Sequence, residues 1–135
     1  MALTVDLKKG EKFIIGDTVI INDSHNRKFE GGARLQILGD APVLRAKDIM
    51  PEQEANSPCK HIYLLVQSMY LTRTPEKYAE PYFGLVRQIQ EGAPGTAPYF
   101  MRINEMIKGG SYYKALKETR KLVDYEQGSL PAQFP

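Results

Sequence analysis

The sequence predicts an α+β fold in which a small antiparallel β unit precedes a bundle of about four α-helices. Before Pro58 hydrophobic residues alternate with period two, and after it they recur every three or four positions. These are the periods of strands and of amphipathic helices. Strands that precede helices favour segregated layers over alternating βαβ units. We therefore expect a β unit over residues 1–50, a linker over 51–58, a helical bundle over 59–128 and a tail over 129–135.

Five short strands are expected in the β unit. They lie at residues 3–7, 12–15, 18–21, 34–38 and 43–45. Gly16 and Asp17 separate the second run from the third, and glycine can take the positive φ that a type I′ or II′ hairpin turn requires. Turn-forming residues dominate 22–33, which predicts a loop or a long hairpin connection.

Four amphipathic segments follow the linker. Their apolar positions are Ile62, Leu65, Val66, Met69 and Tyr70 in the first, Tyr78, Tyr82, Leu85, Val86 and Ile89 in the second, Phe100, Ile103 and Ile107 in the third, and Tyr113, Leu116 and Val123 in the fourth. Pro81 is expected to begin or kink the second helix. Thr96 and Ser111 are candidate N-caps, and Gly128 is expected to end the last helix.

Composition places the chain among ordinary globular proteins. It has 135 residues, 42% of them hydrophobic and 25% charged, with a net charge of +2. Residues 1–57 carry a net charge of −1 and the remainder +3, so neither part is a polycation and any nucleic-acid site is expected to be local. A single cysteine and the lack of a leader or spanning segment predict a cytoplasmic protein with no membrane partner.

No pattern for catalysis is present. The sequence has neither a P-loop nor a Gly-x-Gly-x-x-Gly fingerprint. Cys59 and His61 are two candidate soft ligands, but structural zinc needs four, so a partly buried thiol and a surface imidazole are the favoured interpretation. We expect no catalytic residue, no metal, no cofactor and no enzymatic activity.

Two basic features are candidates for binding. Lys8 and Lys9 form a doubled cation at the end of the first strand, with Arg45 late in the β unit; lysines there also protect a sheet edge from pairing. A secondary basic face on the last helix consists of Lys114, Lys117, Arg120 and Lys121. For that face a solvated helix surface is the favoured interpretation over a binding patch.

The first half of the chain resembles a known family of RNA regulators. The segments "KKGEKFIIGDTVII" and "DAPVLRAKDI" resemble the CsrA family of mRNA-binding translational regulators over residues 3–50. The resemblance implies a CsrA-like β unit whose first strand and the strand after Ala41-Pro42 form an RNA-binding edge. Lys8 takes the place of one of two paired arginines, Leu7 replaces the other, and Lys9 partly restores the charge. Either Arg45 or Lys47 takes the later basic position, depending on where the gap falls.

Over almost its whole length the chain is similar to the FlbT family of flagellum-biosynthesis regulators. The supporting segments include "MALTVDLKKGEKFIIG", "ILGDAPVLRAKDIM", "IYLLVQSMYL", "YFGLVRQI" and "YYKALKETRKLVDYE". This resemblance implies a post-transcriptional repressor that associates with the 5′ untranslated leader of flagellin mRNA and limits its translation or promotes its decay. RNA-binding residues would then be Lys8, Lys9, Arg45 and Lys47.

One alternative and one further expectation accompany this hypothesis. The alternative is a protein-interaction adaptor whose helical half binds flagellin or another flagellar regulator, with indirect effects on mRNA. The further expectation is a homodimer, because a few short strands leave exposed edges that a second copy can pair. The CsrA resemblance implies the same, since that family forms intertwined dimers.

Overall fold

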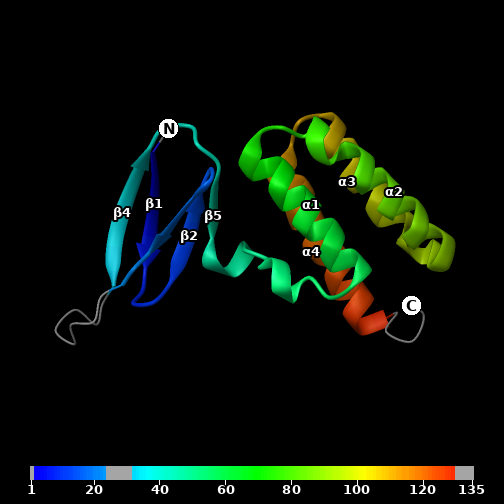
Figure 1. Cartoon of the computed structure of the whole chain (residues 1–135), viewed down its shortest axis with the longest axis horizontal. Coiled ribbons are helices and arrows are strands. Elements are labelled where there is room, and N and C mark those ends of the chain that lie inside the picture. Colours follow the sequence, from blue (N-terminus) through cyan, green and yellow to red (C-terminus); the bar gives the residue numbers. More distant parts are fainter. Residues whose placement is uncertain (1, 24–31, 130–135) are drawn as a thin grey trace. The chain divides into compact units, whose positions relative to one another are not determined.

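Strands occupy the first part of the chain and helices the second (Figure 1). The computed structural model describes residues 2–23 and 32–129. The chain divides into two compact units, Met1–Ile49 and Met50–Pro135. The predicted α+β class, with antiparallel strands before four helices, is confirmed. No helix within the described ranges is long and apolar enough to cross a membrane.

The first unit contains two small antiparallel sheets. Strand β1 (Ala2–Leu7) pairs with β4 (Ala33–Leu38). The second sheet has the order β3-β2-β5, with β2 at Lys12–Ile15, β3 at Thr18–Ile21 and β5 at Val43–Arg45. All five predicted strands are therefore present. Most of the loop predicted over residues 22–33 lies outside the described residues.

Glycines set both tight turns of this unit. Gly16 has φ +59°, and Asp17 is not among the described non-glycine residues with positive φ. The hairpin therefore has the φ pattern of a type II′ turn rather than a type I′ turn. After β1, the N–H of Glu11 donates to the carbonyl of Lys8 at 2.9 Å. Gly10 supplies the positive φ (+81°) that the third position of a type II turn requires.

Alternation along the strands builds the core of the first unit. Val5 and Leu7 of β1 and Phe13 of β2 are buried. Partly buried hydrophobic residues pack around these three, namely Leu3, Ile15, Ile20, Leu35, Ile37 and Val43. Because successive strand residues face opposite sides of a sheet, Thr4, Asp6 and Lys12 remain exposed.

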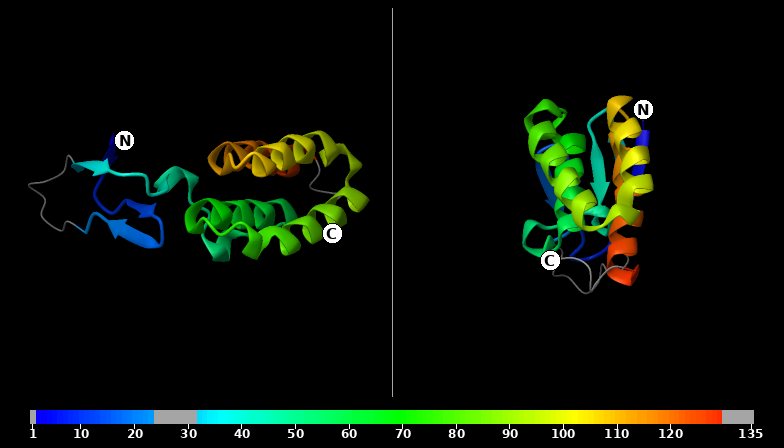
Figure 2. Two further views of the ribbon diagram at one scale, coloured as in Figure 1. Left: turned by 90° about the horizontal axis from the view of Figure 1, so that it is seen from above. Right: turned by 90° about the vertical axis from the view of Figure 1, so that its right-hand side faces the viewer.

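The second unit contains four helices that reverse direction from one to the next (Figure 1). They are α1 (Pro58–Thr72), α2 (Glu76–Gly92), α3 (Ala97–Lys108) and α4 (Tyr112–Ser129). Helix α4 packs against α1 and α3, and α1 packs against α2. In Figure 2 the green α1 and α2 form one layer and the yellow-to-red α3 and α4 form the other.

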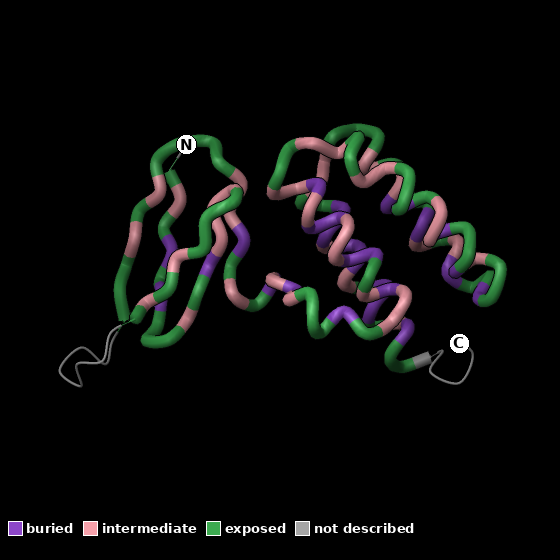
Figure 3. Tube along the Cα trace, in the orientation of Figure 1, coloured by how far each residue is buried: buried purple, intermediate pink, exposed green. Residues whose placement is uncertain are grey.

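Buried residues recur along all four helices (Figure 3). The largest of them are Tyr63, Tyr82, Phe100, Ile62, Met69, Ile103, Leu116 and Leu122. Tyr113, predicted to share the apolar face of α4, is instead 42% exposed. Its ring lies 5.6 Å from that of Tyr70 on α1, so it covers the edge of the α1–α4 contact.

Some predicted details of the helix ends differ in the structure. Thr96 occupies the N-cap position of α3, as predicted, but its side chain does not cap the helix. It is the last residue of the 3-10 turn Pro94–Thr96, its backbone is helical, and its hydroxyl donates to the carbonyl of Ala93 at 2.7 Å. Pro81 lies inside α2, which excludes the first of its two predicted alternatives, that it begins the helix. Gly128 lies inside the last turn of α4 rather than after it.

The segment predicted as a polar linker is partly structured. Glu52–Glu54 form a 3-10 turn, and Ala55 is buried. The side-chain amide of Gln67 on α1 both accepts from the N–H of Met50 (2.7 Å) and donates to its carbonyl (3.1 Å). Met50, the residue just before this segment, is therefore hydrogen-bonded to α1. In the predicted tail, residues 130–135 lie outside the described residues.

Candidate nucleic-acid interface

Strands β1 and β5 of the first unit each have an edge without a hydrogen-bonding strand neighbour among the described residues. There, β1 pairs with β4 alone, and β5 pairs with β2 alone. An open edge presents backbone N–H and C=O groups to any chain or base that lies along it. The two strands that the family resemblance assigns to the RNA-binding edge are therefore both among the described strands with open edges, as are β3 and β4.

A cavity of about 310 Å³ lies between these two strands. Its lining residues are Thr4, Val5, Asp6, Leu7, Glu11, Lys12, Phe13, Arg45, Ala46 and Lys47. Val5, Leu7 and Phe13 belong to the core of the unit, so the base of the cavity is firmly packed. The volume is at the lower end of the range for small-ligand sites, roughly 300–1,000 Å³.

Three cations line this cavity. Arg45 ends β5, Lys47 lies in the following 3-10 turn Ala46–Asp48, and Lys12 begins β2; all three are exposed. The guanidinium of Arg45 donates to the carbonyl of Thr4 on β1 at 3.4 Å. That hydrogen bond is long and therefore weak, which leaves the guanidinium able to exchange the carbonyl for an anionic oxygen.

Two carboxylates also line the cavity, and each already has a partner. Asp6 accepts a hydrogen bond from Arg34, directly opposite on β4, at 2.9 Å, and this bond raises the pKa of Arg34. Glu11 accepts from the backbone N–H of Lys8 at 2.7 Å. Among the described lining residues, three cations outnumber two carboxylates, and Arg34 outside the cavity pairs with Asp6. The site is therefore locally positive in a unit whose overall charge is close to neutral.

The doubled lysine lies beside this cavity rather than in it. Lys8 and Lys9 are exposed in the turn that joins β1 to β2, and neither lines the cavity, although Leu7 and Glu11 on either side do. Leu7, which replaces an arginine of the family pattern, is buried in the core. Of the four predicted RNA-binding residues, the structure thus places Arg45 and Lys47 together.

Lys12 is the cation that the sequence analysis missed. The signal that could have found it is strand alternation: Lys12 precedes the buried Phe13, and Phe13 lies opposite Arg45 in the β2–β5 register. That register becomes evident only once β5 is known to pair with β2.

The secondary basic face on α4 is divided among different neighbours. Lys114 is exposed, and the ammonium of Lys117 lies 5.1 Å from the ring centroid of Tyr113. The guanidinium carbon of Arg120 lies 4.6 Å from the ring centroid of Tyr63 on α1. Both distances are within the range of cation–π attraction. Two of these side chains thus take part in contacts within the helical unit.

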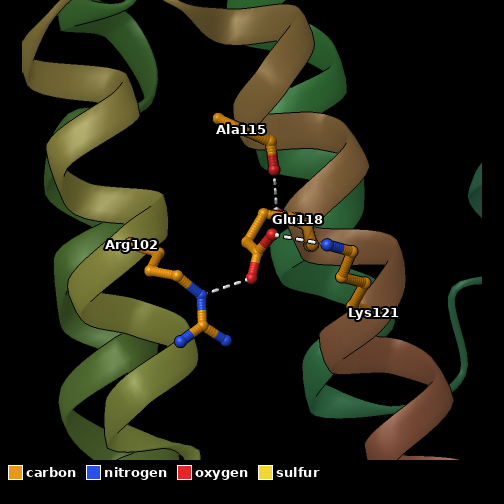
Figure 4. A network of polar contacts seen from close by, with 5 residues as sticks. Arg102, Ala115, Glu118 and Lys121 are labelled. Carbon is orange, nitrogen blue, oxygen red and sulfur yellow. Dashed lines mark hydrogen bonds and ion pairs between the residues drawn. The ribbon is translucent and has the colours of Figure 1, made fainter.

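Lys121 faces a different helix from Arg120. Glu118 is nearly buried on α4 and accepts from Arg102 of α3 at 2.5 Å, while the ammonium of Lys121 lies 3.3 Å from its other oxygen (Figure 4). The hydrogen bond from Arg102, and then the contact with Lys121, lower the pKa of Glu118, although burial acts in the opposite direction. Glu118 therefore joins α3 to α4 as a carboxylate.

The soft-ligand pair carries no metal-binding arrangement. Cys59 is buried, and burial together with the neighbouring Glu126 raises the pKa of its thiol far above the usual range. A protonated thiol is a poor ligand and a poor nucleophile. His61 is exposed on α1. Among the described residues no cluster of three or more His, Cys, Asp or Glu side chains could hold a metal ion.

Comparison with known proteins gives a consistent match along the whole chain. A family model described as the flagellar protein FlbT matches residues 3–130. The chain is 42% identical to a probable flagellum biosynthesis repressor protein, FlbT 1, of Bradyrhizobium diazoefficiens, over 100% of this chain and 91% of that protein. It is 39% identical to a probable FlbT repressor of Rhodopseudomonas palustris, over 96% of this chain and 98% of the relative.

A third relative is more distant. The flagellum biosynthesis repressor protein FlbT of Caulobacter vibrioides is 33% identical over 96% of this chain and 90% of its own length. No solved structure matches the chain.

Proposed function

The chain belongs to the FlbT family of flagellar proteins, and from this we propose that it represses flagellum biosynthesis by binding the 5′ untranslated leader of flagellin mRNA. The resemblance to the FlbT family is confirmed, and the relatives described above are named as repressors of flagellum biosynthesis. In this proposal the bound protein limits translation of the mRNA or promotes its decay. It acts in the cytoplasm, by binding alone and without a cofactor.

The observation that carries the proposal is the positively charged cavity between the open edges of β1 and β5. Single-stranded RNA is recognised through unstacked bases that bond backbone and side-chain groups, while Lys and Arg neutralise phosphates. The cavity combines strand-edge backbone groups with Lys12, Arg45 and Lys47. With only three cations the affinity should be modest and strongly dependent on salt.

Direct binding of purified protein to flagellin leader RNA, with no other protein present, tests the proposal. Replacing Lys12, Arg45 and Lys47 together by Ala should weaken binding at low salt. It should also reduce the slope of log K against log salt by about 2, since each phosphate contact on a single strand contributes roughly 0.7. The variant should remain folded, because exposed side chains usually change stability by no more than about 0.5 kcal/mol each.

A triple variant of equal charge change serves as the control. Lys77, Lys108 and Lys114 are exposed on helices outside the cavity, and their replacement by Ala should leave the salt slope nearly unchanged. If both triple variants lose affinity equally, the cavity has no special role and the proposal of a local site is wrong.

A separate double variant distinguishes the turn from the cavity. Replacing Lys8 and Lys9 by Ala should reduce RNA binding less than the cavity variant does, because neither lysine lines the cavity. If the double variant loses more RNA affinity than the cavity variant, the phosphate contacts lie in the turn rather than in the cavity.

The adaptor function is the second candidate. Exposed large hydrophobic side chains on the helical unit favour it: Phe83 on α2 is 47% exposed and Met101 on α3 is 69% exposed. Side chains of this kind are common where a protein binds another protein. In this case purified protein alone would not shift leader RNA in a gel, and flagellin or another flagellar regulator would be needed to restore the shift.

We also propose that the protein is a homodimer formed through strand edges. Among the described strands, β3 and β4 each have an open outer edge. Val19 and Ile21 on β3 and Leu38 on β4 are large exposed hydrophobic residues. Light scattering at micromolar concentration should give about twice the chain mass of 15.3 kDa, and Val19→Lys should reduce that mass. A wild-type species at the chain mass would contradict the dimer.

A further inference from the structure

A second hollow lies on the helical unit, far along the chain from the strand edges. It is an open groove of about 650 Å³ between α3 and α4, lined by Tyr99, Arg102, Glu118, Lys121, Asp124 and Tyr125. Neither the sequence analysis nor the family resemblance assigns a role to the two tyrosines. Only Lys121 belongs to the secondary basic face defined above.

One wall of the groove is aromatic. The rings of Tyr99 on α3 and Tyr125 on α4 are stacked, with centroids 5.1 Å apart and an interplanar angle of 29°. The guanidinium carbon of Arg102 lies 5.1 Å from the ring centroid of Tyr99. Both tyrosines are half-buried, so part of each ring reaches solvent. Because the two rings stack, each covers one face of the other, and a planar, unsaturated ligand can stack on an outward face of the pair.

The charges of the groove cancel. Arg102 and Lys121 are both held against the carboxylate of Glu118 (Figure 4). Asp124 adds a second negative charge to the lining. Two cations and two carboxylates favour a ligand without net charge over a phosphate. The carboxylate oxygens can accept more than one hydrogen bond each, so they can also receive the N–H groups at the edge of a ring.

We propose that this groove binds a nucleobase of single-stranded RNA, which stacks on an outward face of the Tyr99–Tyr125 pair and donates from its ring-edge N–H groups to Asp124 or Glu118. This rests on the proposed function and adds to it an aromatic stacking surface, which the described residues of the strand edge do not provide, since Phe13 there is buried in the core. Stacking on aromatic rings and bonding at the base edge is how proteins commonly hold unpaired RNA bases.

Tyr99 and Tyr125 also join α3 to α4. A purely structural role for these two tyrosines predicts a different effect of their substitution on RNA binding. If the tyrosines served packing alone, Tyr99→Leu and Tyr125→Leu would lower stability and leave RNA affinity unchanged. If the groove holds a base, these substitutions weaken binding by about 5- to 150-fold per base lost from the stack. Tyr99→Phe and Tyr125→Phe keep the ring and should retain most of the affinity.

The salt dependence separates this groove from the strand-edge cavity. Because an uncharged base releases no counterions, the Leu variants should lower log K by the same amount at every salt concentration. Tyr113→Leu is the matched control: Tyr113 is also a partly exposed tyrosine on α4 with a cation over its ring. This control should bind leader RNA like the wild-type protein.

The test is fluorescence anisotropy with labelled flagellin leader RNA, and circular dichroism verifies that each variant is folded. Leucine variants that bind as well as wild type overturn the groove proposal and leave RNA binding at the strand edge intact. Leucine variants that bind leader RNA normally but no longer repress flagellin synthesis in cells would show that the groove binds a protein partner. That result would also refute the proposal of a nucleobase site. A wild-type protein that fails to bind RNA refutes the proposed function and this inference together.

As a second measurement, leader RNA carrying photoreactive 4-thiouridine is crosslinked to the wild-type protein, and the modified peptides are identified by mass spectrometry. Crosslinks at Tyr99 or Tyr125 are the expected result. Crosslinks confined to the residues that line the strand-edge cavity would exclude a base from the groove.

Discussion

A buried carboxylate on the last helix holds the start of the first one, and its removal should have a large effect on stability. Glu126 of α4 is 2% exposed. One of its oxygens accepts from the backbone N–H of Cys59 at 3.0 Å, and the other accepts from the hydroxyl of Ser57. Ser57 is the N-cap of α1 and also accepts from the N–H of Lys60 at 3.3 Å. The perturbation is Glu126→Ala.

The magnitude follows from the two hydrogen bonds that are lost. A hydrogen bond to a charged group contributes about 1.5–3 kcal/mol, and a buried donor left without an acceptor costs about 1–3 kcal/mol. The N–H of Cys59 belongs to the first turn of α1, where no intrahelical acceptor exists. We therefore expect Glu126→Ala to lower the free energy of unfolding by about 3–5 kcal/mol.

Glu126→Gln is the matched variant. Its carbonyl oxygen can still accept from Cys59 and its NH₂ group can donate to Ser57, whose hydroxyl can turn to accept. Only the charge at the helix N-terminus is lost, which costs about 1–2 kcal/mol. The free energy of unfolding should be highest for the wild-type protein, lower for Glu126→Gln and lowest for Glu126→Ala.

Urea unfolding followed by far-ultraviolet circular dichroism measures this order, because the α-helices of the described chain all lie in residues 58–129. An Ala variant within about 1 kcal/mol of wild type, or a Gln variant as unstable as Ala, would refute the argument that these hydrogen bonds hold α1 to α4.

Three further predictions concern single residues. Gly32 has φ +79°, and a Cβ there would lie 2.6 Å from the carbonyl oxygen of Leu7; Gly32→Ala should lower the melting temperature of the strand unit, and an unchanged melt would contradict this. The folded-state pKa of Glu118 is lowered from 4.5, so its stabilisation is present above that pH and is lost as pH falls through the folded pKa. The difference in unfolding free energy between wild type and Glu118→Gln should therefore shrink below about pH 4.5 in acid titrations, and a constant difference would argue against the ion pairs. Cys59 is fully buried with a raised thiol pKa, so its reaction with a thiol reagent should be slow in the folded protein and fast in urea; rapid labelling without urea would show that the site opens.

Turn chemistry and hydrophobic period determined most of the secondary structure. The hairpin of β2 and β3 follows from Gly16, because a two-residue turn needs a positive φ and the flanking residues favour strands. The four helices follow from apolar residues repeated on one face of each segment. These are local effects, so neighbours in the sequence suffice to predict them. At Thr96 the predicted N-cap position is correct but the side-chain cap is absent, because Thr96 ends the 3-10 turn Pro94–Thr96 and its hydroxyl donates to Ala93 instead.

The candidate sites, in contrast, depend on pairs of residues far apart in the chain. Arg45 reaches Thr4 across 41 positions, and Ser57 meets Glu126 across 69. The sequence indicated Arg45 and Lys47 as candidate basic residues through a family pattern, but it did not indicate that Lys12 joins them. It also gave no sign that Tyr99 and Tyr125 stack. Such contacts depend on strand register and helix packing, which many weak interactions decide together, so only the tertiary structure determines which side chains meet.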